Sequence, residues 1–248
     1  MADITGLSFT DRVLIVGLSQ VVAATILALL TINLYVRYRN RRMPAAKYIT
    51  LVSLFLTLTS CMQLIGANLF EPVLGIQSFG WGLAFGMSAI ANIFLYVFML
   101  EIFSKGIGAG GAKLKIFALV EVSVAVLMPV FGPLSWFMPI FETLLLSVLM
   151  IHLLFSLALY VTLARVTTAS MHKTTDGTSR RGFSLIRLAA FAIIIAYCFF
   201  VLDRVWEIVL EPEGYTVWVL LGWVSAGVSG VLLYLGFVLP SRLRRETK

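Results

Sequence analysis

Charged residues are scarce in this chain. They make up 12% of its 248 residues, whereas hydrophobic residues make up 60%. A soluble globular domain carries about 25% charged residues. The apolar content also exceeds what the interior of one water-soluble domain of this length can bury. The sequence therefore argues against a soluble fold and predicts that lipid is the solvent for much of the chain.

Histidine is nearly absent, and lysine is absent from the middle of the long apolar runs. The two histidines are His152 and His172, and the six lysines lie in segments between the runs, at the edge of the fourth run (Lys115) or at the C-terminal tail. A covalently bound retinal needs a lysine inside the membrane, and haem or zinc needs more metal ligands than the apolar runs supply. We therefore expect no retinal, haem or zinc cofactor and no metal site, and we expect that the chain is not an enzyme.

Cysteine is also rare. The two cysteines, Cys61 and Cys198, both lie inside apolar runs. Cysteine behaves there as a small hydrophobic residue. We therefore expect two buried free thiols rather than a disulfide.

What the chain does have is seven long apolar runs. A helix that crosses the hydrocarbon core needs about 20 mostly apolar residues. The runs cover residues 13–36, 48–70, 79–103, 114–131, 137–163, 183–210 and 215–239. They predict an all-α integral membrane protein in which residues 1–248 form a single domain, a seven-transmembrane-helix bundle. The fourth run is the shortest, and the alternative there is one re-entrant hairpin made by the fourth and fifth runs.

The basic residues are distributed unevenly between the runs. Seventeen of the nineteen Lys and Arg residues fall in four segments, at 37–47, 105–115, 165–187 and 242–248. The intervening connections EPVLGIQS, GPLSW and EPEG contain none. Basic residues accumulate in cytoplasmic loops, so the pattern predicts a multi-pass protein of the cell membrane with its N-terminus outside and its C-terminus in the cytoplasm. It argues against nucleic acid as a partner, because no soluble basic face is available.

The longest connection is expected to be irregular. Residues 164–187 include the sequence TTASMHKTTDGTSRRG, which is rich in Ser, Thr and Gly. Such a composition is typical of loops. We therefore expect a mobile cytoplasmic loop between the fifth and sixth helices.

Ionisable residues inside the runs are the main candidates for a functional site. Such groups are costly in lipid and usually face a partner or a cavity. The outer candidates, which we expect to bind a ligand, are Glu142, His152, Asp203, Arg204, Trp206 and Glu207. One alternative is a structural ion-pair cluster between the fifth and sixth helices. The alternative for His152 is an interior histidine that makes one hydrogen bond.

A second polar group is expected nearer the cytoplasmic side. It consists of Glu101, Glu121 and Asn92. Glu101 has Lys105 four residues later as a helical partner, whereas Glu121 has no basic residue one turn away. Because a charged glutamate is costly in lipid, Glu121 is expected to face the interior of the bundle. For Asn92 the alternative is a purely structural hydrogen bond between helices.

Small residues recur at helical spacing in two of the runs. Gly82 and Gly86 do so in the third run, and Gly222, Ala226 and Gly230 do so in the seventh. Faces of this kind let two helices approach closely in a membrane. They predict packing within the bundle, and the alternative is a homo-oligomer.

The closing segment, LLYLGFVLPSRLRRETK, resembles the exit of prokaryotic seven-helix sensor modules. In that family the last helix ends with Gly-aromatic-x-x-Pro, followed by a basic stretch. The matching residues are Gly236, Phe237, Pro240, Arg242, Arg244 and Arg245. The resemblance implies a membrane sensor or receptor-like module that binds a small or lipidic ligand in the outer half of the bundle. It also implies that the module signals to a cytoplasmic or membrane partner.

Two other functions are open on the sequence alone. One is a small-solute or ion transporter or channel, although no pair of runs shows the matched Gly/Pro interruptions that mark a transport site between repeats. The other is a non-catalytic subunit of a membrane complex.

Overall fold

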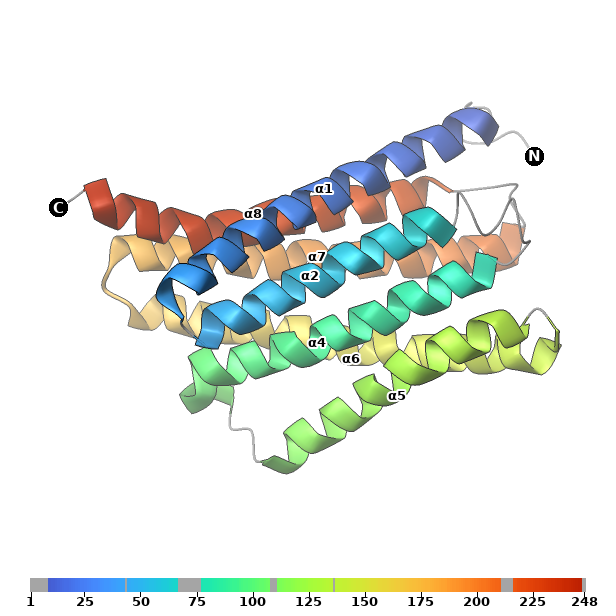
Figure 1. The fold of residues 1–248 in the computed structure, drawn as a ribbon, viewed down its shortest axis with the longest axis horizontal. Coiled ribbons are helices and arrows are strands. Elements are labelled where there is room, and N and C mark those ends of the chain that lie inside the picture. Colours follow the sequence, from blue (N-terminus) through green and yellow to red (C-terminus); the bar gives the residue numbers. More distant parts are fainter. Residues whose placement is uncertain are drawn as a thin grey trace. The chain divides into compact units, whose positions relative to one another are not determined.

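Seven α-helices make up the part of the chain that the structure describes. The computed structural model describes residues 9–42, 44–66, 77–107, 111–135, 137–210 and 216–246. The helices of these ranges (Figure 1) are α1 (Phe9–Arg41), α2 (Pro44–Ile65), α4 (Gln77–Ile107), α5 (Gly111–Ser135), α6 (Pro139–Lys173), α7 (Gly177–Leu210) and α8 (Val217–Glu246). Each contains a segment long and apolar enough to cross a membrane. The predicted all-α fold with seven apolar helices is confirmed at this level.

The fourth predicted span is a complete helix. α5 contains Pro129 and Pro133 and still continues to Ser135. Its apolar segment, Lys115–Ser135, is long enough to cross a membrane by itself. α5 and α6 are therefore two separate helices, each with a segment long and apolar enough to cross a membrane.

The connection between α6 and α7 corrects the loop expected over residues 164–187. α6 continues to Lys173 and α7 begins at Gly177, so only residues 174–176 between them are non-helical. The Asp176 carboxylate accepts hydrogen bonds from the backbone N–H groups two and three residues later, at 3.2 and 3.1 Å. An aspartate in this position caps a helix and satisfies its free N–H groups. The polar composition of this segment therefore marks helix ends outside the apolar core rather than an irregular loop.

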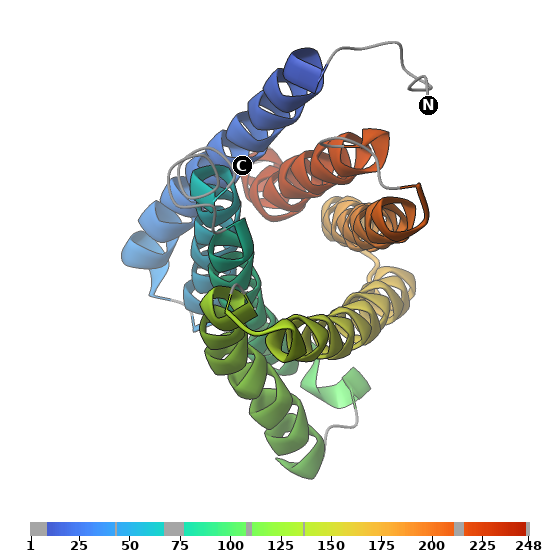
Figure 2. The ribbon, with the colours of Figure 1, turned by 90° about the vertical axis from the view of Figure 1, so that its right-hand side faces the viewer.

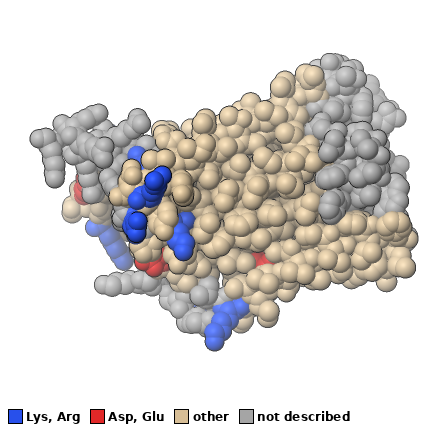
Figure 3. All heavy atoms as spheres, viewed as in Figure 1, with Lys and Arg blue, Asp and Glu red and all other residues tan. Residues whose placement is uncertain are grey.

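Much of the helix surface is apolar. Leu14 and Leu18 of α1 and Leu119 of α5 are each more than half exposed, and the face shown in Figure 3 carries few charged side chains. Cys198 is a free thiol exposed on α7, which corrects its expected burial, whereas the free thiol of Cys61 is partly buried. Lipid tails are as apolar as these side chains, so a membrane protein does not need to cover them. The seven apolar helices thus suggest a multi-pass membrane protein.

The helices group into two compact units. Unit 1 comprises residues 1–26 and 163–248, and unit 2 comprises residues 27–162. Unit 1 holds the start of α1, the end of α6, and α7 and α8. Unit 2 holds the rest of α1, most of α6, and α2, α4 and α5. Each unit contains an apolar core cluster of its own.

In unit 1, α7 packs along α8 (Figure 2). The two helices are close at Gly236, because a Cβ there would lie 2.9 Å from Ile186 Cγ1 and 3.2 Å from Gly182 O. The Ser229 hydroxyl of α8 donates a hydrogen bond to Ala189 O of α7 at 2.9 Å. The core cluster of the unit is Val16, Ala23, Val219 and Trp223. The start of α1 thus packs against α8.

In unit 2, α4 is the central helix and packs against α2 and α5. It is the most buried of the seven helices, with 61% of its most apolar segment buried against 22% for α5. A Cβ at Gly82 would overlap Met128 O of α5, and one at Gly86 would lie 3.1 Å from Ala125 O. The core cluster of the unit is Phe85, Ala89, Val124, Met128 and Leu149. The small-residue face of the third predicted span therefore brings the backbones of α4 and α5 together.

Replacing Gly82 tests this close approach. In Gly82→Ala the added methyl group would meet the Met128 carbonyl, which is held in a helix and cannot move aside. We expect the variant to lose about 1–3 kcal/mol of stability, measured as a lower midpoint of thermal unfolding in detergent. Gly17→Ala is the control, because nothing lies within 4 Å of a Cβ at Gly17 and alanine favours a helix. Equal midpoints for the two variants would contradict the proposed contact.

Candidate functional site

A cluster of polar side chains is buried in unit 2. Its members are Ser88 and Asn92 of α4, Glu121 of α5, and His152 and Ser156 of α6, and we call it the polar cluster. Ser88 is 4% exposed and the other four are 0% exposed. A polar group buried without a partner is costly. The hydrogen bonds among these five side chains therefore decide whether the cluster is stable.

Glu121 is the centre of the polar cluster. Its Oε2 lies 2.9 Å from His152 Nδ1, and its Oε1 accepts a hydrogen bond from Asn92 Nδ2 at 3.3 Å. Asn92 Nδ2 also donates to Ser156 Oγ at 2.8 Å. His152 Nε2 lies 3.3 Å from Ser88 Oγ. One carboxylate thus links three helices.

Helical spacing explains how two helices supply four of the members. Ser88 and Asn92 are four residues apart on α4, and His152 and Ser156 are four residues apart on α6. Residues at this spacing lie on one face of a helix. Each helix therefore presents a pair of polar side chains to the same region, where Glu121 of α5 meets both.

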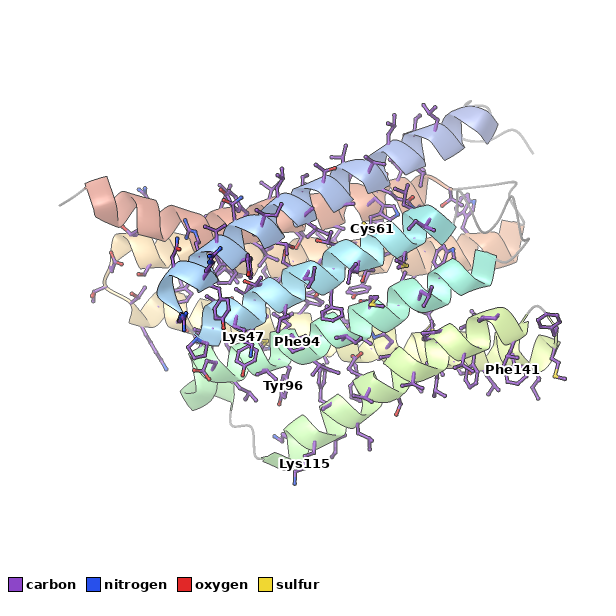
Figure 4. The ribbon with its side chains drawn as sticks, in the orientation of Figure 1. Lys47, Cys61, Phe94, Tyr96, Lys115 and Phe141 are labelled. Carbon is purple, nitrogen blue, oxygen red and sulfur yellow. The ribbon has the colours of Figure 1, made fainter. Side chains whose placement is uncertain are left out.

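Apolar and aromatic side chains flank the polar cluster. Toward the start of α4, Phe85 packs edge-on against the His152 ring, with 6.0 Å between centroids. Toward the other end, Tyr96, labelled in Figure 4, packs against Phe117 of α5 at 4.8 Å, and Phe117 packs against Phe155 of α6 at 5.9 Å. Such surroundings strengthen the hydrogen bonds within the cluster and raise the cost of an unpaired charge.

Asn92 contacts two members of the polar cluster through its amide nitrogen. Asn92 turns its amide nitrogen toward both Glu121 and Ser156, and its Oδ1 is buried with no hydrogen-bond partner among the described residues. An ionised carboxylate can only accept hydrogen bonds. Both carboxylate oxygens of Glu121 have a nitrogen neighbour that can donate. Each oxygen of Glu121 is thus paired with a nitrogen from a different helix.

The structure brings together three of the residues that the sequence selects. Glu121 faces the interior and meets Asn92, its expected neighbour in the inner group. His152, which the sequence places in the outer group, joins them. His152 lies in α6, which continues to Lys173 instead of ending at residue 163.

Asp203 is buried in unit 1, where it fixes the start of α8. It is 2% exposed and accepts a hydrogen bond from the Thr216 hydroxyl. Thr216 Oγ1 in turn accepts a hydrogen bond from the Trp218 N–H at 3.1 Å, as a helix N-cap does. The Trp206 ring of α7 packs against the Trp218 ring, with 6.2 Å between centroids. Asp203 and Trp206 thus join α7 to the first turn of α8.

The other residues that the sequence selects lie elsewhere. Glu101 is exposed on α4 and is not a member of the polar cluster. The side chains of Glu142, Arg204 and Glu207 lie outside the described part of the structure. Within the described ranges, no group of three or more His, Cys, Asp or Glu residues is placed to hold a metal ion. Of the six outer candidates, the structure therefore describes the side chains of three, namely His152, Asp203 and Trp206.

Comparison with protein-family models, with curated proteins and with solved structures found no match to this chain. The resemblance of the closing segment to sensor modules has no support from these comparisons. The seven apolar helices are consistent with such a bundle. However, α8 continues as a helix through Pro240 to Glu246, whereas the resemblance implies that the last helix ends at the proline.

Ser88 and Ser156 are members of the polar cluster that the sequence does not single out. One signal was available, because each lies one helical turn from Asn92 or His152 on the same helix. Serine is also common at close contacts between membrane helices, where it needs no functional partner. The spacing alone therefore does not separate a site residue from a packing residue.

Replacing Thr216 tests the junction at Asp203. Thr216→Val keeps the shape of the side chain but removes the hydroxyl that donates to Asp203 and caps α8. Leaving a buried polar group short of a hydrogen bond costs about 1–3 kcal/mol, so we expect a lower midpoint of thermal unfolding in detergent. Thr216→Ser keeps the hydroxyl and should retain most of the stability. A Thr216→Val protein as stable as the wild type would show that the bond is not structural.

Proposed function

We propose that this chain is a sensor or receptor-like module of the cell membrane that signals to a cytoplasmic or membrane partner. The observation that carries the proposal is the buried Glu121–His152 contact within the polar cluster. Ionisable groups inside a membrane span are costly and mostly mark places where a protein binds, relays or switches. The proposal locates the stimulus at this cluster rather than at the outer residues, since Asp203 is already bonded to Thr216.

The geometry of the polar cluster suits a switch. Glu121, Asn92 and His152 belong to three different helices, and each bond among them crosses from one helix to another. A change in the charge or occupancy of the cluster would therefore alter the contacts of α4, α5 and α6 together. A stimulus can shift a protein between two conformations only by binding them unequally. A site built from three helices changes its geometry when the helices move, so it can bind a stimulus with different affinity in the two conformations.

The proposed orientation has the N-terminus outside and the C-terminus in the cytoplasm. Lys47 and Lys115, both labelled in Figure 4, lie in the first turns of α2 and α5. Arg180 and Arg181 lie in the first turns of α7. Basic residues accumulate on the cytoplasmic side of membrane helices. These three helices would then all begin at the cytoplasmic face.

Labelling of single cysteines tests this orientation. Cys61 and Cys198 are first replaced by alanine, and Met138→Cys or Thr175→Cys is then introduced. Met138 lies between α5 and α6, Thr175 lies between α6 and α7, and both are exposed. In intact cells an impermeant maleimide should label the first variant and should label the second only after permeabilisation. The reverse result would overturn the orientation and leave the helices themselves unaffected.

A proton-coupled transporter is the second candidate, and the same contact supports it. Chains of Asp, Glu and His within membranes serve as proton relays in pumps and transporters. A relay must pass protons from one side to the other, whereas a sensor needs only to bind its stimulus. A measurement of net proton flux across the membrane therefore distinguishes a transporter from a sensor.

Cell response and proton flux together test the sensor proposal. In the cell of origin, Glu121→Gln should reproduce much of the transcript change caused by deletion, because the polar cluster can no longer change its charge in the normal way. His172→Gln should match the wild type, since His172 is exposed and far along α6 from the cluster. In vesicles with an internal pH dye, the purified protein should add no proton flux. An unchanged transcript profile after deletion would overturn the sensor, and a flux lost in Glu121→Gln would replace it with the transporter.

A further inference from the structure

The polar cluster leaves little space for a bound molecule. Glu121 Oε2 and His152 Nδ1 are 2.9 Å apart, which is direct hydrogen-bond contact. The neighbouring polar atoms of Asn92 and Ser156 are also in direct contact, at 2.8 Å. A ligand with heavy atoms would have to separate these groups. A proton adds no volume and can bind without moving them.

The number of protons on the pair sets its net charge. Neutral His152 beside ionised Glu121 carries one negative charge, and a bound proton makes the pair neutral overall. The other members of the cluster, Ser88, Asn92 and Ser156, are uncharged. Removing one charge of a buried pair leaves the other uncompensated, which is strongly destabilising. The buried cluster therefore favours the state in which the pair holds the proton.

We propose that the Glu121–His152 pair is a binding site for a single proton and that this proton is the stimulus of the module. The inference rests on the proposed function and names its stimulus. The proton binds at His152 Nε2, while the hydrogen on Nδ1 continues to face Glu121. Nε2 then changes from a hydrogen-bond acceptor for Ser88 to a donor toward Ser88 Oγ. One N–H bond forms as one O–H bond of a solvent hydronium ion breaks and leaves water, and no bond between heavy atoms changes.

Other titratable groups lie on the same three helices. Those whose side chains the structure describes on α4, α5 and α6 in unit 2 are Tyr96, Glu101, Lys113, Lys115 and Tyr160. Glu101, Lys113 and Lys115 are exposed, and Tyr96 packs against Phe117. On α2, which packs against α4, the groups are Lys47, Tyr48 and Cys61. The hydrogen bonds of the pair are instead with Asn92 and Ser88.

Loss of the proton would change the packing of three helices. It leaves Glu121 with a full negative charge in an apolar interior, where its two hydrogen-bond donors, Asn92 and His152 Nδ1–H, are both neutral. Separation of α5 from α4 or α6 would let water reach the carboxylate and lower this cost. The packing of α4, α5 and α6 around the polar cluster is therefore stabilised at lower pH, where the proton is bound. It loses that stabilisation as the pH rises.

The pH dependence of thermal unfolding tests the inference on the full chain in detergent. The unfolding midpoint of the wild type should fall as the pH is raised through the interval in which the pair releases its proton. In Glu121→Gln the pair is neutral after release, so this fall should be lost. His172→Gln removes the exposed histidine and should keep the fall of the wild type. A Glu121→Gln protein that follows the wild-type pH dependence would overturn the proton site.

A second measurement covers the case in which Glu121→Gln does not fold. The chain has two histidines, so wild-type protein labelled with ¹⁵N-histidine gives ring signals from two residues, and His172→Gln assigns them. The His152 signals should change protonation state over the same pH interval as the fall in the unfolding midpoint. Signals of His152 that stay constant across that interval would overturn the inference. These results come from purified protein, so they are independent of the cell response that tests the sensor proposal.

Discussion

The contact between Glu121 and His152 constrains how α4, α5 and α6 pack against one another in unit 2. A carboxylate with no exposed surface must obtain its hydrogen bonds from protein, and the two that it makes come from different helices. Because those partners are Asn92 of α4 and His152 of α6, the three helices are restricted to one mutual arrangement. Apolar packing alone is tolerant of small shifts between helices, whereas the hydrogen bonds of a buried network require particular distances and angles.

The overall fold could be predicted because the membrane limits what a chain can do. In lipid every backbone N–H and C=O must be paired within the protein, so a long apolar run is expected to form a helix. The runs for α5 and α7 fall inside the observed helices. Their ends were less predictable, since α6 reaches Lys173 and α7 begins at Gly177 with polar sequence. Hydropathy indicates which part of a helix can lie in lipid. The start of α7 is instead indicated by Asp176, a capping residue.

The site was predictable only in part. The cost of a charged group in lipid was enough to select Glu121 and to place it in the interior. Its pairing with His152 was not predictable, because it depends on how far α5 and α6 are shifted along each other. That shift is set by contacts between residues distant in sequence. Ser88 and Ser156 were missed for a related reason, since a serine becomes part of a site only when a neighbouring helix supplies its partner.

The packing of α4 and the polar cluster depend on each other. Gly82, Gly86, Ala89 and Asn92 succeed one another at steps of three or four residues, so they follow one face of α4. The two glycines bring this face against the backbone of α5, and Ala89 continues the contact with a small side chain. The short side chain of Asn92 can reach Glu121 only because the helices are this close. A change in the separation of α4 and α5 would stretch the bond from Asn92 to Glu121, and by linkage a change in the charge of Glu121 would alter the preferred separation. In the proposed switch, the close glycine contact and the hydrogen bond from Asn92 to Glu121 would together convert a local change of charge into a movement between helices.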